Sequence, residues 1–169
     1  MPSEHDLQIS KLIEATDTLL WDAYRSAINR TPPAGKLIFP QTSKKTVRVS
    51  EQEAKQLLIG KLADTPFLFS IETPTLGKYS FKGKGKRNAM TDLTLYTTRG
   101  TPHLNMEFKA GNTSTIRIER KHIKKDIMKL VAEDVNGFWF HILEKANGRG
   151  VETLWKTIRH ELKAVTQDV

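Results

Sequence analysis

The sequence has no cysteine, few aromatic residues and no long apolar run. Without cysteine among its 169 residues, the chain has no disulfide framework, no thiol nucleophile and no cysteine zinc site. Its five histidines are too far apart for the spacing of a metal-ligand pair. The longest apolar stretches fall far short of the ~20 residues that cross a bilayer, and the N-terminus lacks an apolar signal core. We therefore expect a soluble, cytoplasmic protein with no membrane partner.

Acidic residues are fewer than basic ones, and the net charge is distributed unevenly along the chain. The chain has 27 Lys and Arg against 19 Asp and Glu, which gives a net charge of +8. Residues 31–130 carry +11, whereas the two ends together carry −3. Such a basic centre predicts a partner with a phosphate backbone, and nucleic acid fits this better than a membrane surface. A solvated basic face that binds nothing is the alternative.

The length and the balance of 38% hydrophobic and 27% charged residues suit a globular protein with one main core. Apolar residues at helical spacing predict a long helix over 3–29, and Pro32-Pro33 then breaks the chain. We expect an N-terminal helical extension over 1–30 and one domain over 31–169.

The later segments alternate between helix and strand patterns. Ser50 with Glu53 three residues later predicts a helix start, and an apolar run over 67–72, closed by Thr73-Pro74, predicts a strand. The remaining expected elements are strands at 91–97 and 102–110, a helix around 123–131, a strand at 138–143 and a helix from Val151 to Leu162. This order predicts an α/β fold, with a mixed sheet flanked by helices and a parallel last strand pair.

The clearest local pattern is a hairpin of strict alternation. If the chain turns between Arg99 and Gly100, with Thr98 opposite Thr101, then Asp92 lies opposite Glu107 on the polar face. Like charges at facing positions destabilise a sheet. Lys109 on the same face, a divalent cation, or both together would compensate. An exposed sheet face, where the register slips and water screens the pair, is the alternative.

The run Met-Thr-Asp92-Leu-Thr-Leu-Tyr and the later Glu107-Phe108-Lys109, with fourteen residues between Asp92 and Glu107, resemble the signature of the PD-(D/E)XK, or restriction-endonuclease-like, nuclease superfamily. That superfamily has a core of helix, three strands, helix and strand, and residues 50–143 follow this order, with the terminal helices as additions. Thr91 stands where the proline that gives the family its name would be.

The resemblance implies a metal-dependent nuclease that hydrolyses phosphodiester bonds, most naturally in DNA. Asp92, Glu107 and the main-chain carbonyl of Phe108 would bind Mg²⁺ or Mn²⁺, and Lys109 would orient or deprotonate the attacking water. Hard oxygen ligands suit Mg²⁺, and a nearby lysine stabilises developing negative charge. A homodimer would be the usual way to cut both strands. The alternative is a non-catalytic nucleic-acid-binding or assembly module on the same fold.

Two further acids are weaker candidates. Glu53 lies on the helix that in this superfamily often adds a catalytic acid, but a capping box with Ser50 explains it equally simply. Glu72 ends the first expected strand, where it faces either the metal or solvent.

Basic residues outside the motif are candidates for phosphate contacts. The segment 82–87 resembles a phosphate-contacting loop but lacks the spacing of a P-loop, and the segment 124–130 resembles the helix of several superfamily members in which a basic residue approaches the site. A solvated surface is the alternative for both. The predicted nucleic-acid contacts are Lys44, Lys45, Lys82, Lys84, Lys86, Arg87, Lys121, Lys124 and Lys125.

Four ring-bearing residues of the last expected strand and helix are interpreted as structural. Trp139, Phe140 and Trp155 lie in apolar periodic segments, so we expect them to pack in the core instead of stacking on bases. His141 is expected to be a core histidine with its hydrogen bonds satisfied, and not a catalytic base.

Overall fold

The computed structural model describes residues 3–41, 46–48, 50–80, 85–97, 99–111, 116–143 and 148–166, with side chains of 80, 116–122, 165 and 166 left out. The chain forms two compact units, Met1–Pro66 and Phe67–Val169. The division falls after Pro66, not after residue 30, so the helix expected from Ser50 groups with the N-terminal helix.

The first unit contains two helices that pack together, α1 (Glu4–Asn29) and α2 (Glu51–Leu62). A capping box starts α1. Ser3 N–H donates to Asp6 Oδ2 at 2.9 Å, and Asp6 N–H donates to Ser3 Oγ at 3.2 Å. Asp22 and Gln41 then hold the returning chain on α1: Ala34 N–H donates to Asp22 Oδ2 at 2.8 Å, and Gln41 Nε2 donates to the carbonyl of residue 27 at 2.7 Å.

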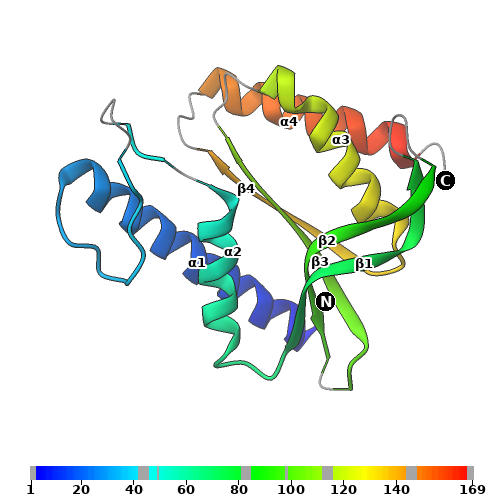
Figure 1. Ribbon diagram of the computed structural model, residues 1–169, viewed down its shortest axis with the longest axis horizontal. Helices are drawn as coiled ribbons and strands as arrows, with labels where there is room; N and C mark the ends of the chain where they lie inside the picture. Colours follow the sequence, from blue (N-terminus) through cyan, green and yellow to red (C-terminus); the bar gives the residue numbers. More distant parts are fainter. Residues whose placement is uncertain are drawn as a thin grey trace. The chain divides into compact units, whose positions relative to one another are not determined.

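The second unit is built on a four-stranded mixed sheet in the order β1-β2-β3-β4 (Figure 1). Its strands are β1 (Leu68–Ser80), β2 (Lys86–Tyr96), β3 (Pro102–Gly111) and β4 (Asn136–Leu143). The first three strands are antiparallel, and β4 runs parallel to β3 as the crossover predicts. The expected α/β class, with a mixed sheet flanked by helices, is confirmed.

The hairpin of β2 and β3 has the register that alternation predicts. Leu93 faces Met106, and the pairing continues in step to Leu95 and Leu104. A shift follows, because Tyr96 pairs with Pro102 and Thr97 N–H donates to the Thr101 carbonyl at 2.9 Å. The expected pairing of Thr98 with Thr101 is therefore wrong. Gly100 supplies the left-handed backbone of this wider turn, with φ of 76°.

The apolar face of the hairpin is buried as expected. Five side chains are at most 7% exposed, and they are Leu93, Leu95, Leu104, Met106 and Phe108. The Phe108 ring stacks against Phe140 of β4, with centroids 5.7 Å apart.

The opposite face of the sheet carries α3 (Ile116–Ala132) and α4 (Gly148–Thr166), which lie side by side (Figure 1). Ile123 and Ile127 of α3 and Leu154 of α4 form a buried cluster, and Trp139 and Leu143 of β4 pack against it. No helix in the described ranges is long and apolar enough to cross a membrane.

β1 is longer than the strand expected over 67–72. Pairing with β2 continues through Thr73 and Pro74, breaks, and resumes at Lys78. Pro74 fits because β1 is an edge strand, where the missing N–H breaks no ladder. β2 likewise begins at Lys86, five residues before its expected start.

The interruption in β1 is a bulge held by Glu133, which directly follows the last turn of α3. Glu133 is 8% exposed, and its carboxylate accepts the N–H groups of Leu76 at 2.9 Å and Gly77 at 3.0 Å. It also accepts the Tyr79 hydroxyl at 3.0 Å. A Cβ at position 77 would lie 3.2 Å from Glu133 Oε1, a tight contact that would push this carboxylate back by a few tenths of an ångström.

Replacing Glu133 should loosen the bulge. We expect Glu133→Ala to lower the free energy of unfolding by about 2–4 kcal/mol, because three donors lose a charged acceptor. Urea unfolding measures the change. The neighbouring exposed residue gives the control, since Asp134→Ala should have little effect. Equal stabilities of the Glu133 and Asp134 variants would contradict this role.

Candidate active site

The three residues of the sequence motif lie on one face of the sheet. The paired residues of β2 and β3 end at Leu93 and Met106, and Asp92 and Glu107 are the next residues on each strand. Phe108 N–H donates to Asp92 Oδ2 at 2.8 Å, which holds the Asp92 carboxylate against the main chain of the motif. Lys109 lies two residues beyond Glu107 and therefore shares its face.

Glu107 is a buried carboxylate, only 1% exposed. Burial raises its pKa to about 8, while the Lys129 ammonium acts in the opposite direction. The negative charges of Asp126 and Asp92 raise the pKa of Glu107 further. The Lys129 ammonium lies 2.6 Å from Glu107 Oε1.

Lys129 is itself buried, and its ammonium group joins α3 to both central strands. It donates to the Met90 carbonyl of β2 at 3.0 Å and lies 3.4 Å from Asp126 Oδ1. Asp126 Oδ2 lies 3.2 Å from the Lys109 ammonium. Glu107 and Asp126 thus contact the ammonium groups of Lys109 and Lys129, and Asp92 is held to the strand between them by the Phe108 N–H. We call Asp92, Glu107, Lys109, Asp126 and Lys129 the motif cluster.

The sequence predicts that a basic residue of the segment 124–130 approaches the site, but it does not indicate which one. The predicted candidates Lys124 and Lys125 are exposed, whereas Lys129 is the residue that reaches Glu107. The signal was present: Asp126 and Lys129 fall on the apolar side of the helix, next to Ile127. Charged residues within an apolar stripe require partners, and here the partners are site residues.

Of the two weaker acidic candidates, one belongs to the first unit and the other is exposed on β1. Glu53 caps α2, accepting Ser50 N–H at 3.0 Å, and it belongs to the first unit. Glu72 is exposed, although the pairs Ile71–Leu93 and Thr73–Thr91 bracket Glu72 and Asp92 in the β1–β2 ladder. Its φ of 53° is a left-handed conformation that is uncommon for a non-glycine residue in a strand.

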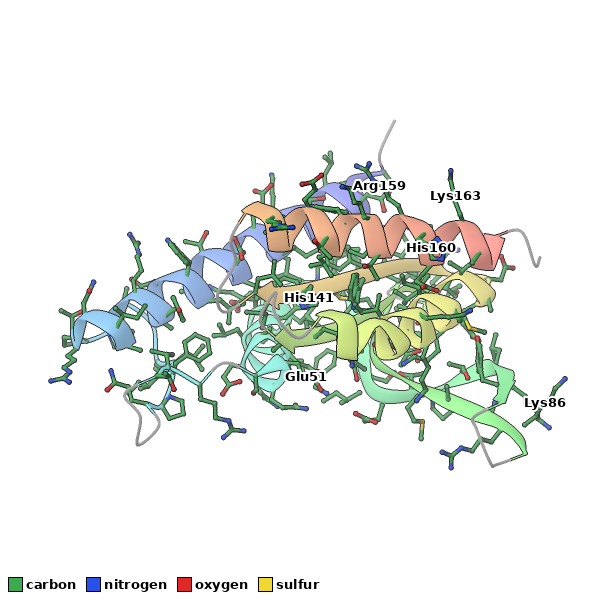
Figure 2. All side chains as sticks on the ribbon, turned by 90° about the horizontal axis from the view of Figure 1, so that it is seen from above. Glu51, Lys86, His141, Arg159, His160 and Lys163 are labelled. Atoms are coloured by element: carbon green, nitrogen blue, oxygen red, sulfur yellow. The ribbon has the colours of Figure 1, made fainter. Side chains whose placement is uncertain are left out.

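The predicted nucleic-acid contacts are only partly described. Lys86 and Arg87 are exposed where β2 begins, and Lys86 projects from the outer end of the strand pair (Figure 2). Lys44, Lys45, Lys82 and Lys84 lie outside the described residues, as does the side chain of Lys121.

His141 lies beside the motif lysine, because β4 pairs it with Lys109. The prediction that the hydrogen bonds of His141 are satisfied is wrong, because neither ring nitrogen has a hydrogen-bond partner among the described residues. Burial, and secondarily the Lys109 charge, lower the pKa of His141 to about 4. The Trp139 ring meets it edge-on, with centroids 5.0 Å apart.

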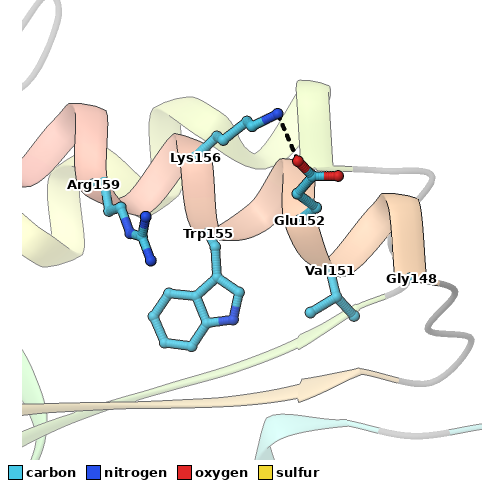
Figure 3. Close-up of a pocket in the computed structure, with 6 residues that line it drawn as sticks. All are labelled: Gly148, Val151, Glu152, Trp155, Lys156 and Arg159. Carbon is cyan, nitrogen blue, oxygen red and sulfur yellow. Dashed lines mark ion pairs between the residues drawn. The ribbon is translucent and has the colours of Figure 1, made fainter.

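Trp155 does not pack in the core as expected but is 56% exposed on α4. Its indole lines an open depression of about 370 Å³ with Val151 and Arg159 (Figure 3). The other lining side chains, Glu152 and Lys156, form an exposed ion pair of 2.8 Å. This depression shares none of its lining residues with the motif cluster.

The motif cluster suits a hard cation with few protein ligands. No group of three or more His, Cys, Asp or Glu residues arranged to hold a metal ion is present in the described part of the chain. Mg²⁺ commonly uses only one or two carboxylates, with water and substrate phosphate as its other ligands. Asp92 and Glu107 provide such a pair, and because the pKa of Glu107 is raised to about 8, a cation bound there would displace a proton from this carboxyl.

Comparisons with protein-family models, curated proteins and solved structures give no match. The motif and the geometry of this chain are therefore the basis of the proposed function.

Removing the central ammonium should be costly. Lys129→Met leaves Glu107 and Asp126 buried with one counter-charge fewer, and we expect a loss of about 3–5 kcal/mol in the free energy of unfolding. Adding Glu107→Gln should restore part of it, because the neutral amide needs no counter-ion. The exposed pair supplies the control, since Lys156→Met should change little. The free energies of unfolding are measured in urea. If the effects of the Lys129 and Glu107 substitutions simply add, the two residues are not coupled and the prediction is wrong.

His141 should make the protein less stable in mild acid. The unfolded chain binds the imidazole proton near pH 6.5, whereas the folded chain binds it only near pH 4. The unfolded state therefore holds more protons between these values, and stability falls as the pH falls, by on the order of 2 kcal/mol after allowing for partial exposure. His141→Gln should reduce this slope, and His160→Gln at an exposed position should not. Parallel stability curves for all three proteins would be the contrary result.

Proposed function

We propose that this protein is a metal-dependent nuclease that hydrolyses phosphodiester bonds in DNA. The observation that carries the proposal is the bond from Phe108 N–H to Asp92 Oδ2, which joins the two halves of the sequence motif. Asp92, Glu107 and Lys109 thus share one sheet face, next to a buried ammonium from α3. Two carboxylates beside a lysine are the groups that metal-assisted phosphodiester hydrolysis requires.

Each motif residue has a defined part in this proposal. Asp92, Glu107 and the Phe108 carbonyl would hold Mg²⁺ or Mn²⁺. The cation would polarise the phosphodiester and lower the pKa of a bound water. Lys109 orients that water and stabilises negative charge as it develops. Asp126, 3.2 Å from the Lys109 ammonium, holds this lysine in position.

The arrangement of the sheet supports the finer assignment of a restriction-endonuclease-like core. α2, the three antiparallel strands, α3 and the parallel β4 follow the order of elements that the resemblance implies. The motif acid lies on β2 and the Glu-x-Lys segment on β3, directly beyond the last paired residues of these two strands. A homodimer would allow both strands of a duplex to be cut.

One observation favours a non-catalytic nucleic-acid-binding module as the second candidate. The Lys129 ammonium already neutralises Glu107 at 2.6 Å, so a cation is not needed to balance that carboxylate. In this reading the basic surface binds nucleic acid and the carboxylates serve only to fix α3 to the sheet. The nuclease would require a divalent ion for its reaction, whereas the binding module would catalyse no reaction.

Substrate tests separate the candidates. The protein should cleave supercoiled, linear or single-stranded DNA, or RNA, in Mg²⁺ or Mn²⁺ and not in EDTA. Lys109→Ala should lower turnover by ~100-fold or more and change DNA affinity by only a few-fold, because the ammonium acts chiefly in the transition state. Cleavage is followed on gels and affinity by fluorescence anisotropy.

Neutralising the hairpin cations provides the matched comparison. Lys86→Ala with Arg87→Ala should weaken binding to all sequences and reduce the salt slope by up to about two, because each phosphate contact releases about 0.9 of a counter-ion. If the parent binds DNA but cleaves no substrate with either metal, the nuclease assignment fails and the binding module replaces it.

A further inference from the structure

Leu76 is the most exposed large apolar side chain in the described part of the chain, at 83%. It lies in the β1 bulge, between Pro74 and Lys78, where pairing with β2 is interrupted. Met90, which pairs with Pro74, is 50% exposed as well. Leu76 and Pro74 of the edge strand and Met90 of β2 are therefore exposed apolar residues around the bulge, and we call them the β1 wedge.

The backbone beneath Leu76 is fixed. Its N–H and that of Gly77 both donate to the Glu133 carboxylate, at 2.9 and 3.0 Å. On the other side, the Thr75 hydroxyl donates to the Gly77 carbonyl at 2.9 Å and accepts Ala89 N–H at 2.9 Å. Thr75 and Glu133 are themselves buried. An exposed leucine on a backbone held this firmly is preorganised to insert into a partner, because little conformational freedom is lost on binding.

The charges around the β1 wedge identify the partner. Between Thr73 and Thr91 the sequence has five cations and no acid. Three of these cations are described, and Lys78, Lys86 and Arg87 are all exposed on the paired ends of β1 and β2. An apolar side chain flanked by cations fits duplex DNA, where leucine or methionine wedges between base steps and cations contact the adjacent phosphates.

We propose that the β1 wedge inserts Leu76 between two base pairs from the minor groove and unstacks that step beside the candidate active site. The inference rests on the proposed function for its nucleic-acid partner. Glu133, which holds the wedge, directly follows α3 and is four residues beyond Lys129 of the motif cluster. One helix thus positions both the wedge and the cluster, so a duplex held by one is presented to the other.

The test uses a duplex with 2-aminopurine at successive positions, in EDTA so that no strand is cut. The parent should raise the fluorescence of 2-aminopurine at one step, because unstacking relieves its quenching. Leu76→Ser should abolish this rise and weaken duplex binding about tenfold, with an unchanged salt slope, because only an apolar contact is lost. Leu68→Ser, an exposed leucine at the other end of β1, should behave like the parent.

An unchanged fluorescence rise and affinity in Leu76→Ser would overturn the wedge. So would sedimentation data in which Leu76→Ser dissociates a dimer of the parent while the DNA response stays the same, since Leu76 would then join two copies of the chain. The outcomes separate the two proposals. A Leu76-dependent signal without cleavage in any metal keeps the wedge and removes the nuclease, and cleavage without that signal does the reverse. Failure to bind any nucleic acid would overturn both.

Discussion

The site depends on the contacts of the buried Lys129 ammonium group. Removing a lysine from water is costly, and it is tolerated only when the charge has close partners. Here Glu107 lies 2.6 Å away, Asp126 3.4 Å away and the Met90 carbonyl 3.0 Å away. These partners belong to β3, α3 and β2. A single charged group therefore fixes the helix against the two strands that carry the motif.

The same helix fixes two other features of the second unit. Asp126 holds the motif lysine, Lys109, and Glu133 holds the β1 bulge from just beyond the C-terminal end of α3. Asp126 and Lys129 are three residues apart and face the same side of α3, and Glu133 follows the helix directly. The C-terminal end of α3 therefore carries residues that hold the motif cluster and the backbone beneath the exposed Leu76. In the two proposals, the cluster would supply the groups for hydrolysis and the wedge would hold and deform a duplex.

The features that sequence predicted are those determined by local patterns. Strict alternation gave the β2–β3 register and placed Asp92 next to Glu107, and helical spacing with capping boxes gave α1 and α2. The features it missed depend on contacts between distant residues. Nothing local to Pro74 says that β1 continues past it, because this requires knowing that β1 is an edge strand. The bulge depends on Glu133, more than fifty residues away, and Trp155 lies exposed despite its apolar neighbours.

The central claim is that Asp92 and Glu107 exist to hold a divalent cation on a phosphodiester. Electron paramagnetic resonance of free Mn²⁺ tests this directly when the ion is titrated into the protein bound to a phosphorothioate duplex that resists cleavage. The parent complex should bind at least one Mn²⁺ more per chain than the Asp92→Asn complex, because one carboxylate ligand is lost. Identical Mn²⁺ binding by the two complexes would contradict the account and leave the carboxylates as partners of Lys129 alone.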